Sequence, residues 1–80
     1  MKIEIYSKGW CPFCQRAKAL LERIGLEYTE YNVEAEEGRL EEMLQRADGR
    51  RTVPQVFLDD RGIGGYTELY RLEQDGGLSR

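Results

Sequence analysis

The feature that most constrains this sequence is the motif Cys11-Pro12-Phe13-Cys14, which follows a short apolar stretch at residues 3–6. Proline is common in the first turn of a helix, because the N–H that it lacks has no partner there. If a helix begins at Pro12, the two sulfurs lie one turn apart on the same side and can form a disulfide. The free N–H groups at the helix start stabilise negative charge, so we expect the pKa of Cys11 to lie below that of a free cysteine.

The size and charge of the chain narrow the classes of protein to which it can belong. Eighty residues with 40% hydrophobic side chains predict one domain, residues 1–80, around a single core. A net charge of −3 does not suggest a nucleic-acid partner. Residues 1–25 nevertheless carry a net charge of +3 and the remaining residues −6, so the cysteines lie in the basic part of an acidic chain. Basic surroundings favour both a thiolate and an anionic substrate.

The sequence predicts a cytoplasmic protein, and in that compartment its cysteines favour redox chemistry over metal binding. No apolar run is long enough to span a membrane and no signal-peptide core is present, so we expect no membrane partner. Structural disulfides do not persist in that compartment, which favours a redox role for the pair. Two cysteines and no histidine cannot supply the four ligands of a zinc site within one chain, and they exclude a Cys-His hydrolase. We expect no bound metal.

The spacing of apolar residues predicts seven elements. Alternation and β-rich composition predict strands, steps of three and four predict helices, and glycines mark the ends of all three helices. The predicted strands span residues 2–6, 26–33, 53–58 and a short stretch around Ile63, and the predicted helices span residues 12–24, 36–47 and 66–75. This βαβαββα order predicts an α/β fold, a four-stranded mixed sheet with helices on both faces. A ligand is expected at the carboxyl end of the first strand, where the cysteines lie.

Three motifs in this order resemble the glutaredoxin family, within the thioredoxin-like fold. They are Cys11-Pro12-Phe13-Cys14 after the first strand, Thr52-Val53-Pro54 before the third, and Gly64-Gly65 before the last helix. The resemblance spans essentially the whole chain. It implies a cis Pro54 facing the cysteines, and glutathione as a co-substrate with no bound cofactor. It also implies protein partners that contain disulfides or are glutathionylated.

The resemblance assigns roles to individual residues. It implies that Cys11 is the nucleophile, Cys14 the resolving thiol, and Lys8 a basic group that favours the thiolate and meets a glutathione carboxylate. Phe13 stands where the family commonly has tyrosine, which keeps a packing wall but loses a hydroxyl. The remaining implied glutathione contacts are Thr52, Val53, Pro54, Gly65, Tyr66, Thr67 and Glu68. The family often has aspartate where Thr67 and Glu68 stand, and threonine carries no charge to attract the γ-glutamyl ammonium.

Other interpretations remain open at this point. The electron source could be thioredoxin reductase, and a second class of function is a glutathione-ligated iron–sulfur cluster module shared by two chains. A redox-inert binding domain is a third. Trp10 could line the substrate surface or cover the helix end, and the sequence does not fix whether Arg39 points toward glutathione. Arg16 and Lys18 are expected on the surface, and nothing indicates an obligate oligomer, so we expect a monomer.

Overall fold

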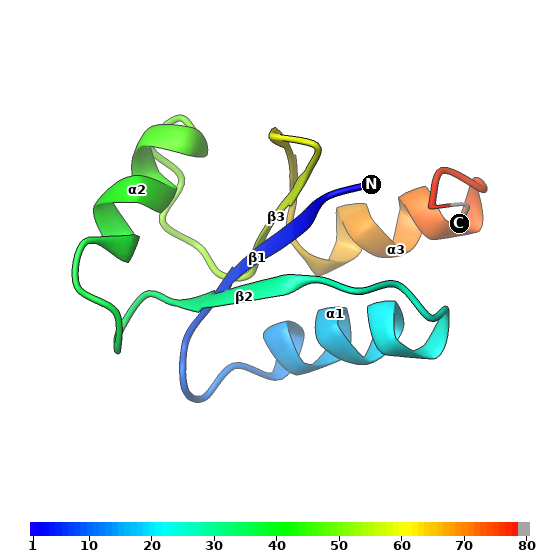
Figure 1. Ribbon diagram of the computed structural model, residues 1–80, viewed down its shortest axis with the longest axis horizontal. Coiled ribbons are helices and arrows are strands. Elements are labelled where there is room, and N and C mark those ends of the chain that lie inside the picture. Colours follow the sequence, from blue (N-terminus) through cyan, green and yellow to red (C-terminus); the bar gives the residue numbers. More distant parts are fainter. Residues whose placement is uncertain (79–80) are drawn as a thin grey trace.

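The computed structural model describes residues 1–78 and forms a four-stranded sheet with three helices (Figure 1). The elements are β1 (Ile3–Ser7), α1 (Pro12–Arg23), β2 (Thr29–Asn32), α2 (Arg39–Arg46), β3 (Gln55–Leu58), β4 (Arg61–Gly64) and α3 (Tyr66–Gln74). The strand order is β2-β1-β3-β4. β1 pairs with β2 in parallel, whereas β3 is antiparallel to both β1 and β4. The predicted mixed sheet and thioredoxin-like fold are confirmed.

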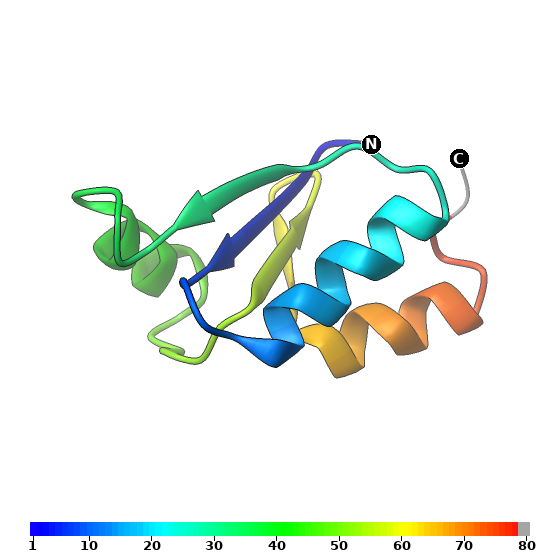
Figure 2. The ribbon, with the colours of Figure 1, turned by 90° about the horizontal axis from the view of Figure 1, so that it is seen from below.

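Helices cover both faces of the sheet, as predicted. α1 and α3 lie side by side on one face, and α2 lies toward the other (Figure 2). Strand alternation divides the side chains between the faces: Ile3 and Ile5 of β1 enter the core under α1 and α3, while Tyr6 packs with Met43 of α2. Among residues 1–78, no helix is long and apolar enough to cross a membrane.

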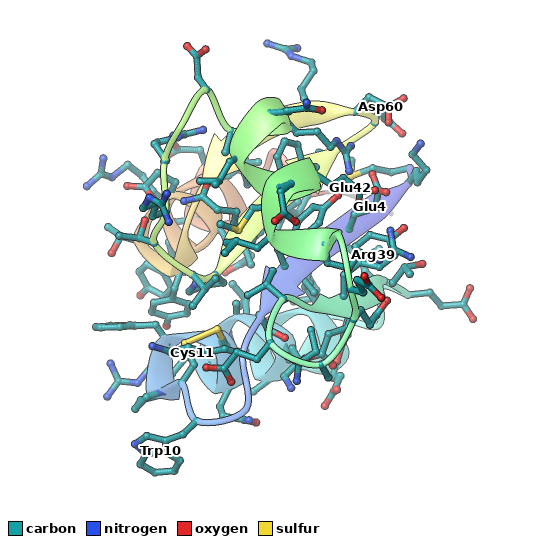
Figure 3. All side chains as sticks on the ribbon, turned by 90° about the vertical axis from the view of Figure 1, so that its left-hand side faces the viewer. Glu4, Trp10, Cys11, Arg39, Glu42 and Asp60 are labelled. Atoms are coloured by element: carbon teal, nitrogen blue, oxygen red, sulfur yellow. A yellow bond between two sulfur atoms is a disulfide. The ribbon has the colours of Figure 1, made fainter. Side chains whose placement is uncertain are left out.

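A charged and aromatic cluster attaches α2 to the sheet (Figure 3). Arg46 donates to a carboxylate oxygen of Glu4 and to the hydroxyl of Tyr6, both at 2.8 Å, and its guanidinium lies 4.2 Å from the centre of the Phe57 ring. The Tyr6 hydroxyl in turn donates to Glu42 at 2.5 Å. Burial, together with the hydrogen bond to Glu42, raises the pKa of Tyr6 to about 12. The hydrogen bond from Arg46 lowers the pKa of Glu4.

The predicted second strand, residues 26–33, is too long. Leu26 instead completes the end of α1: its N–H donates to the carbonyl of Leu21 at 3.0 Å, and Gly25 N–H donates to Glu22 at 3.1 Å. Gly25 adopts φ +79°, so the glycine ends the helix as expected. The strand therefore begins only at Thr29, which is opposite Glu4 in the register with β1.

The predicted second helix, residues 36–47, begins three residues too early. The side-chain oxygen of Asn32 accepts from the N–H groups of Glu34 and Ala35, which holds this stretch in a turn. The Glu36 carboxylate closes the turn by accepting from Asn32 N–H at 3.1 Å. Gly38 has φ +84°, and α2 begins directly after this left-handed residue.

The remaining bounds differ by one or two residues. Pro54 has no N–H to donate, so the β3 ladder begins at Gln55, which pairs with Tyr6, and not at residue 53. Ser7, predicted in the loop, ends β1. The turn at Asp59 and Asp60 has positive φ at both residues, which matches the expected tight reversal into β4.

We predict that Arg46→Met lowers the free energy of unfolding by about 2 kcal/mol at neutral pH, because Glu4, whose side chain is 10% exposed, loses its main partner. Glu4 has a lowered pKa in the folded state, so its contribution is complete above about pH 5 and is lost as the pH falls through that lowered pKa. The stabilities of variant and native chain should therefore converge in acid. Urea unfolding from pH 7 to pH 3 measures this.

Arg23→Met is the matched control, because Arg23 also occupies the last turn of a helix and is exposed. It should change stability by no more than about 0.5 kcal/mol. Equal losses in the two variants, or an Arg46→Met loss that does not shrink in acid, would contradict the assigned role of the cluster.

Candidate redox site

Cys11 and Cys14 form a disulfide across the first turn of α1, with their Cα atoms 5.1 Å apart. Cys11 is the residue that caps the helix: its backbone is extended, and its sulfur accepts a hydrogen bond from the Cys14 N–H at 3.1 Å. Pro12 is the first helical residue, as the motif predicted. Both cysteines are buried, Cys14 completely. The sulfur of Cys11 thus lies at the positive end of the helix, which stabilises a thiolate when the disulfide is reduced.

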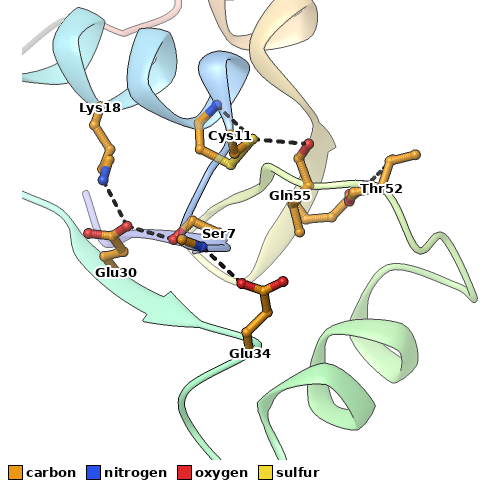
Figure 4. Close-up of a disulfide and its surroundings, with 10 residues drawn as sticks. Ser7, Cys11, Lys18, Glu30, Glu34, Thr52 and Gln55 are labelled. Carbon is orange, nitrogen blue, oxygen red and sulfur yellow. Dashed lines mark hydrogen bonds and ion pairs between the residues drawn. A yellow bond between two sulfur atoms is a disulfide. The ribbon is translucent and has the colours of Figure 1, made fainter.

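The segment before β3 crosses directly beside the cysteines (Figure 4). The Val53–Pro54 peptide bond is cis, as the family resemblance implied. The Val53 carbonyl oxygen lies 3.7 Å from the Cys11 sulfur. On its other side the segment meets the turn before α3, since a Cβ on Gly65 would lie 3.2 Å from the Pro54 carbonyl oxygen. Val53 and Pro54 therefore lie between the disulfide and the start of α3.

A groove of about 190 Å³ opens at this point. Its lining comes from three separate parts of the chain: the first turn of α1, the segment before β3, and the turn and first residues of α3. The lining residues are Phe13, Thr52, Val53, Pro54, Gly65, Tyr66, Thr67 and Glu68. These are the residues that the family resemblance implies as glutathione contacts, apart from Lys8, and the structure brings them together next to Cys11.

Lys8 lies outside this groove. It is exposed in the loop between β1 and α1 and is not among the groove-lining residues. The loop is attached to the β2–α2 turn, because the Gly9 N–H donates to the Glu34 carboxylate at 3.1 Å. Trp10 is 81% exposed and projects away from the molecule, so it does not cover the helix end (Figure 3).

Aromatic rings form one wall of the groove. The rings of Phe13 and Tyr66 stack with their centres 6.2 Å apart, and Tyr70 continues the row one helical turn further along α3. The guanidinium of Arg16 lies 5.2 Å from the centre of the Phe13 ring. The wall that Phe13 was expected to provide is therefore present without a phenolic hydroxyl at this position.

The turn before α3 packs so closely against the Glu68 side chain that a Cβ would not fit at Gly64. The Glu68 carboxylate accepts from the Gly65 N–H at 2.7 Å and so closes the first turn of α3. A Cβ on Gly64 would lie 2.7 Å from that same carboxylate oxygen, and Gly64 has φ +110°. Both Thr67 and Glu68 are exposed and line the groove, but Glu68 also caps its own helix.

Sequence reasoning missed a polar network behind the dithiol. The carboxylate of Glu30 accepts from the fully buried Ser7 hydroxyl at 2.6 Å and from Lys18 at 2.9 Å (Figure 4). Partial burial raises the pKa of Glu30, but the two hydrogen bonds outweigh it and the net pKa is lowered. The expectation that Lys18 lies on the surface is wrong, because its side chain joins α1 to β2 and is only 19% exposed. The sequence could have indicated this, because Lys18 lies four residues after Cys14 and therefore on the same side of the helix.

Arg39 points away from the groove. It pairs with Glu36 and Glu42, both at 2.9 Å, and its guanidinium lies 4.0 Å from the centre of the Tyr31 ring. The structure thus settles a direction that the sequence left open. Within the part of the chain that the structure describes, no three His, Cys, Asp or Glu side chains are placed to hold a metal ion together.

Comparison with known proteins agrees with this geometry. The glutaredoxin family model matches residues 3–63. Glutaredoxin 3 of Escherichia coli is 47% identical over 76 residues, which cover 95% of this chain and 90% of that protein. The chain belongs to the glutaredoxin family. Like its relatives, this glutaredoxin is a thiol-disulfide oxidoreductase, and Cys11 and Cys14 supply its redox-active dithiol.

Two solved structures of other glutaredoxins extend the comparison. The solution structure of glutaredoxin from Brucella melitensis has a TM-score of 0.80 at 42% identity, covering 98% of this chain and 84% of that one. The crystal structure of a buckwheat glutaredoxin–glutathione complex has a TM-score of 0.84 at 32% identity, covering 95% of this chain and 71% of that one. The fold around the dithiol is therefore shared with a glutaredoxin that binds glutathione.

Proposed function

We propose that this glutaredoxin reduces protein disulfides and glutathione mixed disulfides with electrons from glutathione. The observation that carries the proposal is the groove of Phe13, residues 52–54 and residues 65–68, which opens beside the Cys11 sulfur. An extended tripeptide attached to Cys11 would run along Val53, whose N–H and C=O can pair with it like a neighbouring strand. The likeness to a buckwheat glutaredoxin–glutathione complex supports the same ligand.

The proposed reaction starts from the reduced pair. The Cys11 thiolate attacks the glutathione sulfur of a mixed disulfide, the S–S bond breaks, and the substrate thiolate leaves with the electron pair. Cys11 is then joined to glutathione. A second glutathione thiolate attacks the glutathione sulfur of this adduct, which releases oxidised glutathione and restores the Cys11 thiolate. Each turn thus consumes one glutathione thiol, releases the substrate thiol, and joins the incoming glutathione to the glutathione of the mixed disulfide as oxidised glutathione.

The reduction of a protein disulfide also uses the second cysteine, Cys14. After Cys11 forms a mixed disulfide with the substrate, the Cys14 thiolate attacks the Cys11 sulfur and the substrate thiolate leaves. The product is the Cys11–Cys14 disulfide that the structure contains. Two glutathione molecules then reduce it in sequence. Cys14 suits the role of the resolving thiol, because it is fully buried and lies one turn into α1 behind Cys11.

The groove offers a better partner to the carboxylate of the γ-glutamyl end of glutathione than to its ammonium group. The backbone N–H groups at the start of α3 suit the γ-glutamyl carboxylate. The ammonium beside that carboxylate meets Thr67, which carries no charge, while Glu68 is held by the Gly65 N–H. We therefore propose that this chain holds the ammonium more weakly than a glutaredoxin with aspartate at position 67.

We predict that Cys11→Ser abolishes the reduction of the mixed disulfide between glutathione and cysteine, because no other sulfur can form the adduct. Cys14→Ser should retain this activity but lose the reduction of protein disulfides. The rates are measured with glutathione, glutathione reductase and NADPH. Loss of the first activity in Cys14→Ser would contradict the role of Cys11 alone, and a native chain that turns over only with thioredoxin reductase would overturn the proposed function.

We also predict that Thr67→Asp lowers the KM for the same mixed disulfide by about two- to fivefold, as expected for one exposed ion pair with the ammonium. Thr67→Asn is the matched control, since it has the shape of aspartate without the charge, and it should behave like the native chain. The gain should diminish as salt is added. Identical KM values for the two variants would show that charge at position 67 has no part in binding.

A further inference from the structure

Gln55 is a buried polar residue that the reaction does not use directly. It is the first residue of β3, lies opposite Tyr6 of β1, and is 2% exposed. We propose that Gln55 is a positioning residue that orients Thr52, and with it the hydroxyl of Thr52, for binding glutathione. The inference rests on the proposed function, because it assigns the residue that prepares one side of that groove.

The contacts of Gln55 are directed at a single residue of the groove (Figure 4). Its side-chain nitrogen lies 2.8 Å from the Thr52 carbonyl oxygen and 3.1 Å from the Thr52 hydroxyl oxygen. A carbonyl oxygen can only accept, so the atom that faces it must be the amide nitrogen and not the amide oxygen. The Gln55 amide thus spans the cis Val53–Pro54 bond and fixes both the backbone and the side chain of Thr52.

The hydrogen bonds from Gln55 determine how the Thr52 hydroxyl can bind a ligand. A hydroxyl has one hydrogen and two lone pairs. Because the Thr52 oxygen accepts from Gln55, its own hydrogen is not used in that contact and remains available to an acceptor. Thr52 is exposed and lines the groove. The hydroxyl is therefore prepared to donate to a carboxylate or carbonyl oxygen of the tripeptide, while Val53 is presented to its backbone.

Within residues 1–78, the Gln55 amide is satisfied on one side only, because its nitrogen donates to Thr52 while its oxygen is buried without a hydrogen-bond partner. Burying an unpaired acceptor is costly, and methionine would fill a similar space without that cost. Residues flanking Gln55 in β3 are apolar and buried, namely Val56 and Phe57. A role in preparing Thr52 for a ligand accounts for an amide at this buried position.

The test is a double-mutant cycle on the full chain, with the mixed disulfide between glutathione and cysteine as the probe. Gln55→Met should raise its KM about five- to tenfold, the effect of one or two lost hydrogen bonds, and leave kcat within about twofold. Thr52→Val should raise KM similarly, and Thr52→Ser, which keeps the hydroxyl, should not. The double variant Gln55→Met/Thr52→Val should be no worse than the poorer single variant, because both act through one hydroxyl.

Gln45→Met is the matched control, because Gln45 is exposed on α2, and it should leave KM and kcat unchanged. Native KM in Gln55→Met, or effects that multiply in the double variant, would overturn the inference. If Gln55→Met does not fold, the ¹⁵N-labelled side-chain amide of Gln55 provides the measurement: its protons should exchange slowly in the native chain and faster in Thr52→Val, and equal rates would overturn it. A native chain inactive on the probe would instead refute the proposed function.

Discussion

The hydrogen bond from the Cys14 N–H to the Cys11 sulfur is the contact on which the site depends. It makes a cysteine the cap of α1, so the sulfur occupies the place where free N–H groups converge and negative charge is stabilised. β1 brings the chain to this point, and β3 begins next to it, which places the Val53 carbonyl 3.7 Å from the sulfur. A reactive sulfur and a backbone edge for its substrate thus meet without any histidine in the chain.

The two faces of the sheet serve this arrangement in different ways. The apolar face packs α1 against α3, so both helices begin at the same end of the molecule and their first turns line one groove (Figure 2). The opposite face holds α2 through Arg46, Glu4 and Tyr6, and these contacts lie away from the dithiol. Two helix starts facing one groove give it a positive potential, which suits an anionic tripeptide.

Much of the fold and site follows from local patterns in the sequence. The proline after Cys11, the glycine after α1 and the order of the elements determine the helix start, its end and the sheet, and three motifs determine most of the groove. The two wrong boundaries have physical causes. Asn32 forms a turn, so α2 begins later than predicted, and Leu26 belongs to the cap of α1, so β2 begins later than predicted. A polar residue such as Gln55 gives no sign in the sequence that it is buried, since polar side chains are usually exposed and its hydrogen bonds to Thr52 are visible only in the structure.

We propose that glutathione joined to Cys11 lies along Val53 in the groove between Phe13 and α3. The most direct measurement is the structure of Cys14→Ser with glutathione trapped on Cys11 as a mixed disulfide. We predict backbone hydrogen bonds between the tripeptide and both the N–H and the C=O of Val53, with the γ-glutamyl carboxylate at the start of α3. Glutathione that instead extends across the loop of Lys8 and Trp10, with residues 52–54 free of contact, would contradict the account.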